Sequence, residues 1–202
     1  MSLERDIEYM LIALEQAKAA MQQGEVPVGA VLVHGDDIVA CAHNMTETLD
    51  DPTAHAELIA IRQAAKKLGK RGLSQCELYV TVEPCAMCAG AIINARLKKT
   101  VFGAHESRTG CMGSVMDISD GVFINSVRAY GGIMEEECSA LMQAFFADKR
   151  LTKKLLGPIV QICTLLQSWP QYKLYSQTRY RRFIYCTYLR HIFGLSYHHR
   201  KR

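Results

Sequence analysis

Every acidic residue of this chain lies within its first 150 residues. The 202-residue sequence holds 20 Asp and Glu and 24 Lys and Arg, and residues 151–202 contain ten of the bases but none of the acids. Residues 1–150 therefore carry a formal charge of −6 and the remainder +10. Such a division is typical of a globular domain followed by a basic tail. We expect one folded domain over residues 1–150 and, over 151–202, an extension that is disordered or foreign to the domain.

The extension allows three interpretations. Six tyrosines between Tyr172 and Tyr197 interleave with arginines and lysines, and such a mixture could stack on bases and neutralise phosphates. Alternatively the segment is a disordered or loosely helical basic tail, or the product of an altered reading frame near residues 150–155. The intact mass of the native protein separates these, because a mass ending near 150–155 excludes a functional tail.

The sequence predicts a cytoplasmic protein with no membrane partner. No stretch approaches the roughly 18 apolar residues of a membrane span, and the N-terminal MSLERDIEYM carries acids where a secretory signal is basic. Without such a signal, the eight cysteines are expected to be free thiols rather than a disulfide framework.

Strand and helix patterns alternate along the first 150 residues. We expect helices over residues 3–21, 55–68, 84–96 and 135–149, and strands over 28–33, 38–42, 78–82, 100–103 and, weakly, 124–127. Interleaved strands and helices place helices on both faces of one sheet, and the hairpin at 28–42 makes that sheet mixed. The prediction is an α/β fold of three layers, α/β/α, with about five strands.

Two cysteines open the expected helix at 84–96. Cys85 and Cys88, in the motif Pro-Cys-Ala-Met-Cys, are spaced i and i+3 and so lie on one helix face. The positive end of the helix dipole lowers thiol pKa values, and thiolates are zinc ligands. A single Cys-x-x-Cys pair supplies only two ligands, and it is also typical of thioredoxin-like redox sites.

His55 is the natural third ligand. Glu57 lies two residues further and does not share its helix face, so a Cys₂His set would leave one position for water, as in catalytic zinc sites. Glu57 could then act as general base and general acid. An isolated His-x-Glu is mostly coincidence, but His-x-Glu followed by Pro-Cys-x-x-Cys is a known signature of zinc-dependent nucleobase deaminases.

The stretches around these motifs extend the likeness. They are GEVPVGAVLV at 24–33, His43-Asn44, DPTAHAE at 51–57, LYVTVEPCAMCAGAI at 78–92, VFGA at 101–104, TGCMGS at 109–114 and ECSALMQAFF at 137–146. Over about residues 3–150 the chain resembles the bacterial tRNA-specific adenosine deaminases. Cytidine, cytosine and guanine deaminases share the zinc motifs, and the flanking stretches indicate the tRNA branch.

The resemblance implies a cytidine-deaminase-like fold and a zinc enzyme that converts adenosine to inosine at the wobble position of a tRNA anticodon. It implies zinc ligation by His55, Cys85 and Cys88, with zinc-bound hydroxide attacking C6 and Glu57 as proton shuttle. Water would be the only co-substrate, with no redox cofactor. The implied partners are the tRNA anticodon stem-loop, in particular an arginine tRNA with an ACG anticodon, and a second copy of the chain in a homodimer.

The same resemblance implies substrate contacts. Asn44 matches a family asparagine at the target nucleotide, although an asparagine in a loop is also a common turn former. Val28 and the Ala56 backbone N–H would help hold the base. Glu106 stands where the best-known bacterial members have aspartate. Arg108, like Lys98 and Lys99, is a candidate phosphate contact, whose ordinary alternative is a solvated surface.

Two rival functions stay open at this point. A free-base or nucleotide deaminase would act on guanine or cytosine and not on an anticodon stem-loop. A zinc-dependent RNA-binding subunit without catalysis would have no need of the carboxylate of Glu57, so the presence of that residue favours an enzyme.

Overall fold

The computed structural model of the chain describes residues 3–121 and 123–167, with side chains as far as residue 154. It divides into two units, residues 1–148 and 149–202. In the second unit the described residues continue the last helix. The Tyr-rich stretch of the predicted extension lies outside the described residues, so its three interpretations stay as they were.

Five strands form one mixed sheet in the first unit. The strands are β1 (Gly29–His34), β2 (Asp37–His43), β3 (Cys76–Val82), β4 (Lys99–Ala104) and β5 (Arg128–Tyr130). Their order is β2-β1-β3-β4-β5, with β1 antiparallel to both neighbours and β3, β4 and β5 mutually parallel. The predicted mixed sheet of about five strands is confirmed.

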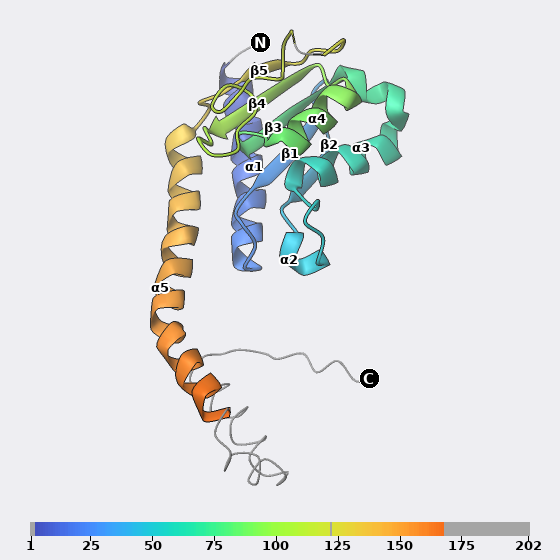
Figure 1. Cartoon of the computed structure of the whole chain (residues 1–202). Coiled ribbons are helices and arrows are strands. Elements are labelled where there is room, and N and C mark those ends of the chain that lie inside the picture. Colours follow the sequence, from blue (N-terminus) through green and yellow to red (C-terminus); the bar gives the residue numbers. More distant parts are fainter. Residues whose placement is uncertain (1–2, 122, 168–202) are drawn as a thin grey trace, which may run out of the picture. The chain divides into compact units, whose positions relative to one another are not determined.

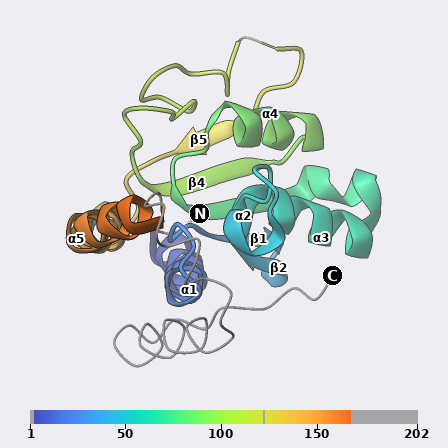
Figure 2. The same cartoon turned by 60° about the horizontal axis from the view of Figure 1, so that its bottom comes forward.

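Helices cover both faces of this sheet, as predicted (Figures 1 and 2). The helices are α1 (Leu3–Gln22), α2 (Thr46–Leu49), α3 (Ala56–Gly72), α4 (Ala86–Ala95) and α5 (Glu135–Gln167), with a 3-10 turn η1 (Leu73–Gln75). α3 and α4 pack on one face, and α1 with the first turns of α5 packs on the other. None of the described helices has the length and apolar character to cross a membrane.

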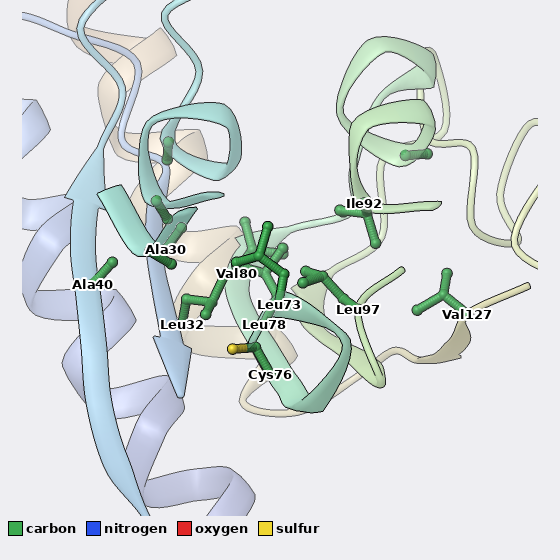
Figure 3. Packing of buried hydrophobic residues seen from close by; sticks show 14 of the residues in the cluster. Ala30, Leu32, Ala40, Leu73, Cys76, Leu78, Val80, Ile92, Leu97 and Val127 are labelled. Atoms are coloured by element: carbon green, nitrogen blue, oxygen red, sulfur yellow. The ribbon is translucent and has the colours of Figure 1, made fainter. Parts of the chain in front are cut away.

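Neighbouring strand residues supply the two halves of the core. Leu32 and Leu78 face α3 and α4 in the larger cluster (Figure 3), whereas Val31 and Tyr79 face α1. Successive side chains of a strand point to opposite faces, and both faces of β1 and β3 are covered, so most side chains of these two strands are apolar. This explains why residues 78–82 read as a continuous apolar run.

Four elements differ from the sequence-based expectation. α2 lies between the expected strand at 38–42 and the expected helix at 55–68, where no element was expected, because a four-residue helix shows no periodicity. β5 lies at Arg128–Tyr130 rather than at 124–127, since a three-residue edge strand leaves little pattern. α3 continues past Gly69, whose positive φ of 70° interrupts the helix where it was expected to end. α5 runs beyond residue 149 to Gln167.

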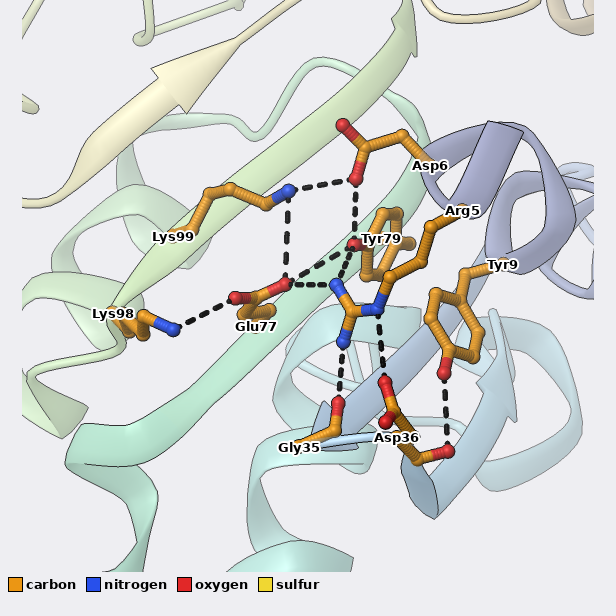
Figure 4. Close-up of polar contacts among 9 residues, drawn as sticks. All are labelled: Arg5, Asp6, Tyr9, Gly35, Asp36, Glu77, Tyr79, Lys98 and Lys99. Carbon is orange, nitrogen blue, oxygen red and sulfur yellow. Dashed lines mark hydrogen bonds and ion pairs between the residues drawn. The ribbon is translucent and has the colours of Figure 1, made fainter. Parts of the chain in front are cut away.

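A buried ionic cluster fastens α1 to the starts of β3 and β4 (Figure 4). The Glu77 carboxylate accepts a hydrogen bond from Arg5 at 2.7 Å, and Lys99 Nζ lies 2.7 Å from the Asp6 carboxylate. Burial alone would raise the pKa of Glu77, but hydrogen bonds from Arg5 and Lys98 and the charge of Lys99 lower it to about 2. Lys99 is only 1% exposed. The prediction of Lys99 as a phosphate contact is therefore wrong, and Lys98 pairs with Glu77 at 3.2 Å.

Candidate active site

The two motifs meet at the N-termini of α3 and α4. His55 is the residue before α3, and Cys85 is the residue before α4. Because β3 leads directly into the Pro84–Cys85 step, the cysteines lie at the carboxyl end of a parallel strand, where α/β folds commonly place their sites. His55, Cys85 and Cys88 bring one ligand atom each to within 4.8 Å of the others.

The spacing of these three atoms suits a tetrahedral metal ion. His55 Nδ1 lies 3.8 Å from Cys85 Sγ and 3.4 Å from Cys88 Sγ. A tetrahedral zinc with its usual bond lengths separates a thiolate sulfur from an imidazole nitrogen by about 3.6 Å. Two sulfurs and one nitrogen are also a donor set that zinc prefers. The residues therefore fit zinc, and three protein ligands leave one coordination position open.

The electrostatics favour a thiolate at this place. Hydrogen bonds from the Cys88 thiol and the His55 imidazole lower the pKa of Cys85 to about 4, against the opposing effect of burial. The Cys85 sulfur beside Cys88, together with burial, raises the pKa of Cys88. A metal ion bound here would displace the thiol proton of Cys88, because only thiolates ligate.

Glu57 is buried beside the three ligand atoms. It occupies the first turn of α3, is 4% exposed, and its Oε2 has no hydrogen-bond partner among the described residues. Burial raises the pKa of Glu57. A buried carboxyl oxygen without a partner is costly unless a ligand satisfies it. The arrangement can therefore accept and donate a proton at a reaction centre next to a metal site.

A cavity of about 230 Å³ opens onto these groups. Its lining contains seven residues that sequence reasoning selected: Val28, Asn44, His55, Glu57, Cys85, Glu106 and Arg108. Ala56 and Cys88 are buried and do not line the cavity. Seven further lining residues were missed: Val26, Thr46, Val82, Glu83, Thr109, Met142 and Phe146. Of these, Thr109 lies in the TGCMGS stretch, and Met142 and Phe146 lie in the ECSALMQAFF stretch, whose likeness to the family was the available signal.

Asn44 is held by a second buried carboxylate. Its Nδ2 donates to Glu25 Oε2 at 3.1 Å and to Thr46 Oγ1 at 3.0 Å. Glu25, which is fully buried, also accepts the backbone N–H of Thr48 at 2.6 Å. Burial alone would raise the pKa of Glu25, but hydrogen bonds from Thr48, from the Glu47 backbone N–H and from the Thr46 hydroxyl lower it. Asn44 thus lies in the cavity wall with a fixed amide.

Elsewhere in the cavity lining, Glu106 and Arg108 contact each other. Glu106 Oε1 accepts the Arg108 backbone N–H at 2.9 Å and the guanidinium Nε at 3.4 Å. The Arg108 side chain is 77% exposed, whereas that of Glu106 is 18% exposed. A cation at the rim of a pocket with an acidic interior is suited to a polyanionic substrate whose neutral base enters the pocket.

The sequence was compared with protein families and with known proteins, and the matches span the residues that form the site. The model of the MafB19-like deaminases matches residues 4–150. The tRNA-specific adenosine deaminase of Bacillus subtilis is 44% identical over 153 residues, which span 75% of this chain and 95% of that protein. The enzyme of the same name from Aquifex aeolicus is 44% identical over 144 residues, 71% of this chain and 95% of that protein.

Solved structures share the architecture. A structure from a study of A-to-I editing by tRNA:A34 deaminases at the wobble position matches with a TM-score of 0.63 at 39% identity, covering 66% of this chain and 98% of that one. A guanine deaminase from Nitrosomonas europaea gives a TM-score of 0.61 at 24% identity, over 70% of this chain and 84% of that one. The second likeness extends to the fold alone.

Proposed function

This chain belongs to the family of tRNA-specific adenosine deaminases and is an enzyme, and from that premise we propose that it converts adenosine 34 of a tRNA anticodon to inosine. The reaction consumes water and releases ammonia. The observation that carries the proposal is the unpartnered, buried carboxyl oxygen of Glu57 beside the ligand atoms of His55, Cys85 and Cys88.

We propose zinc as the cofactor, held by His55, Cys85 and Cys88. Two thiolates and one imidazole match its preference, and the Nδ1–Sγ separations of 3.4 and 3.8 Å bracket the value for tetrahedral geometry. When bound, zinc would supply a Lewis acid that lowers the pKa of a water molecule towards about 7.

Glu57 moves the protons. Its carboxylate accepts a proton from the attacking water and delivers it to N1 of the adenine ring as the C6–O bond forms. A second proton passes through the same carboxyl to the leaving amine, and ammonia departs as the C6–N bond breaks. The raised pKa of Glu57 suits both directions, because a group that holds its proton more tightly is the better base and can still act as an acid near neutral pH.

The cavity walls would hold the nucleoside. A base must leave its stack to reach a buried reaction centre, and anticodon loops present bases that can be splayed out. Val28 and the fixed amide of Asn44 line the cavity, and the Ala56 N–H lies in the first turn of α3, where backbone donors point out of the helix. Glu106 and the exposed Arg108 would meet the ribose and phosphates.

Sequencing of tRNA incubated with the purified protein tests the proposal. Inosine reads as guanosine after reverse transcription, so we expect an A-to-G change at position 34, and first in an arginine tRNA with an ACG anticodon. Parallel assays with free guanine and cytosine test the rival substrates. Turnover of a free base with no change in tRNA would overturn the assignment.

We also propose that the enzyme is a cytoplasmic homodimer. Large apolar side chains are exposed on one stretch of the chain: Val115, Met116, Phe123, Ile124 and Tyr130. Exposed apolar groups gathered in this way favour association with another surface. Light scattering on the eluted protein is expected to give twice the chain mass, and a monomer mass at micromolar concentration would contradict it.

A further inference from the structure

A buried carboxylate outside the catalytic set holds one wall of the cavity. Glu83 directly follows β3 and is 3% exposed. Its oxygens accept the backbone N–H groups of Glu106, Met112 and Ser114, each at 3.0 Å, and the Ser114 hydroxyl. Three backbone donors converging on one carboxylate form a built connection and not a chance surface contact.

The segment bound in this way, residues 105–114, supplies Glu106, Arg108 and Thr109 to the cavity lining. It also lies against the metal-ligand motif, because the Cys111 N–H donates to the Pro84 carbonyl at 2.9 Å. The Glu83 backbone leads to Cys85, while its side chain holds the segment. One residue therefore sets the distance between the metal-ligand side of the cavity and the wall that carries Arg108.

Gly110 lies directly against the Glu83 carboxyl group. A Cβ at this position would lie 2.6 Å from the Glu106 carbonyl oxygen and still closer to the Glu83 carboxyl. No positive φ requires glycine here. The close approach of the Glu83 carboxylate and of the Glu106 carbonyl oxygen therefore leaves no room for a side chain at this position.

We propose that Glu83 is a positioning residue, which fixes segment 105–114 so that Glu106 and Arg108 meet the RNA while Glu57 meets the base. The proposal rests on the proposed function. Because Glu83 acts through the segment, its loss is expected to weaken RNA binding and to leave proton transfer at Glu57 largely intact.

The test compares Glu83→Gln with Glu77→Gln. Both residues are buried carboxylates, placed just after the end and at the start of β3, but Glu77 contacts α1 and no part of the cavity. In Glu83→Gln, an NH₂ group replaces one acceptor oxygen and faces backbone N–H groups that need an acceptor. We therefore expect KM for an anticodon stem-loop to rise about tenfold. We expect kcat to stay within about threefold of the wild type and the zinc content to be unchanged. Glu77→Gln is expected to lower the melting temperature and leave KM unchanged.

Gly110→Ala and Gly90→Ala form a second matched pair that keeps Glu83 itself. A Cβ at Gly90 meets nothing within 4 Å. Gly110→Ala is expected to reproduce the raised KM, and Gly90→Ala to behave as the wild type. In the Arg108→Ala background, Glu83→Gln is expected to raise KM by a smaller factor than in the wild type, because the part of its effect that acts through Arg108 is then gone.

Three outcomes would overturn the proposal: an unchanged KM in Glu83→Gln, a similar KM shift in Glu77→Gln, or full multiplication of the Glu83 and Arg108 effects. Hydrogen exchange adds a readout independent of turnover, since the amides of Glu106, Met112 and Ser114 are expected to exchange faster in Glu83→Gln than in the wild type. If the wild-type protein forms no inosine, the proposed function is overturned instead. The role of Glu83 is then decided by comparing the wild type with Glu83→Gln in stem-loop affinity and in amide exchange.

Discussion

Nδ1 of His55 lies 3.4 Å from Sγ of Cys88, although 33 positions separate the two residues in the chain. The approach follows from the fold, because His55 precedes α3, Cys88 lies in the first turn of α4, and both helices cover the same face of the sheet. The ligand atoms therefore come together through the packing of two helix N-termini.

Substitution of a ligand is expected to remove the metal. Cys88→Ala leaves one thiolate and one imidazole, too few for a stable zinc site, so the purified variant is expected to contain little zinc and to form no inosine. Elemental analysis with about one zinc per wild-type chain as reference checks this. Cys41→Ala, a thiol in β2 away from the site, is the control and keeps its zinc.

Substitution of Glu57 is expected to separate metal binding from catalysis. Glu57→Ala and Glu57→Gln retain zinc, because neither changes a ligand, but inosine formation falls by about 10²–10⁴-fold as proton transfer is lost. Initial rates on the stem-loop together with zinc per chain measure both quantities. Wild-type rates in either variant would remove Glu57 from the mechanism.

Gly29→Ala is expected to destabilise the domain. The glycine lets β1 approach α1, since a Cβ there would lie 2.5 Å from the Ala17 nitrogen and closer to the Ala13 carbonyl oxygen. Displacement of the helix should cost about 3 kcal/mol or more of unfolding free energy. Denaturant titration measures it. Gly90→Ala, with open space around it in α4, is the control and should gain about 0.5–1 kcal/mol.

Acid is expected to remove the contribution of Glu77 to stability. Its pKa is about 2 in the folded chain against an ordinary value of 4.5, so the ionised form stabilises the fold above pH 4.5. That contribution is lost as the pH falls from about 4.5 towards about 2. The difference in unfolding free energy between the wild type and Glu77→Gln should therefore shrink over this interval, as urea titrations at each pH would show. A pH-independent difference would contradict the assigned ionic role.

The sequence predicted the strands and helices that carry the site because their signals are local. Proline and small residues open α4, and β3 is mostly apolar and buried at every position because both of its faces are covered. Glycine at position 69 marked a real break in α3, although the helix resumes after it. The short elements α2 and β5 were missed or misplaced, since neither is long enough to show a period.

The residues that carry the chemistry of the candidate site could be predicted from the sequence, whereas many of the residues that line its cavity could not. Spacing and residue type indicated His55, Cys85 and Cys88, but nothing local indicates that Met142 of α5 reaches the cavity. A lysine in a sequence also looks the same whether it is solvated or paired in the interior, and for this reason Lys99 was misassigned. Whether a lysine is solvated or buried depends on partners that are distant in the chain, and the pattern of a single sequence does not identify those partners.

The pairing of Asp6 with Lys99 has a consequence for synthesis. The ribosome makes α1 before β4, and the ammonium group that pairs with the Asp6 carboxylate is added 93 residues later. Until β4 has been made, the sheet face on which α1 packs is incomplete. The apolar face of α1 therefore cannot finish docking early in synthesis. The helix α1 is thus made before β4 but completes its packing only after β4 has formed.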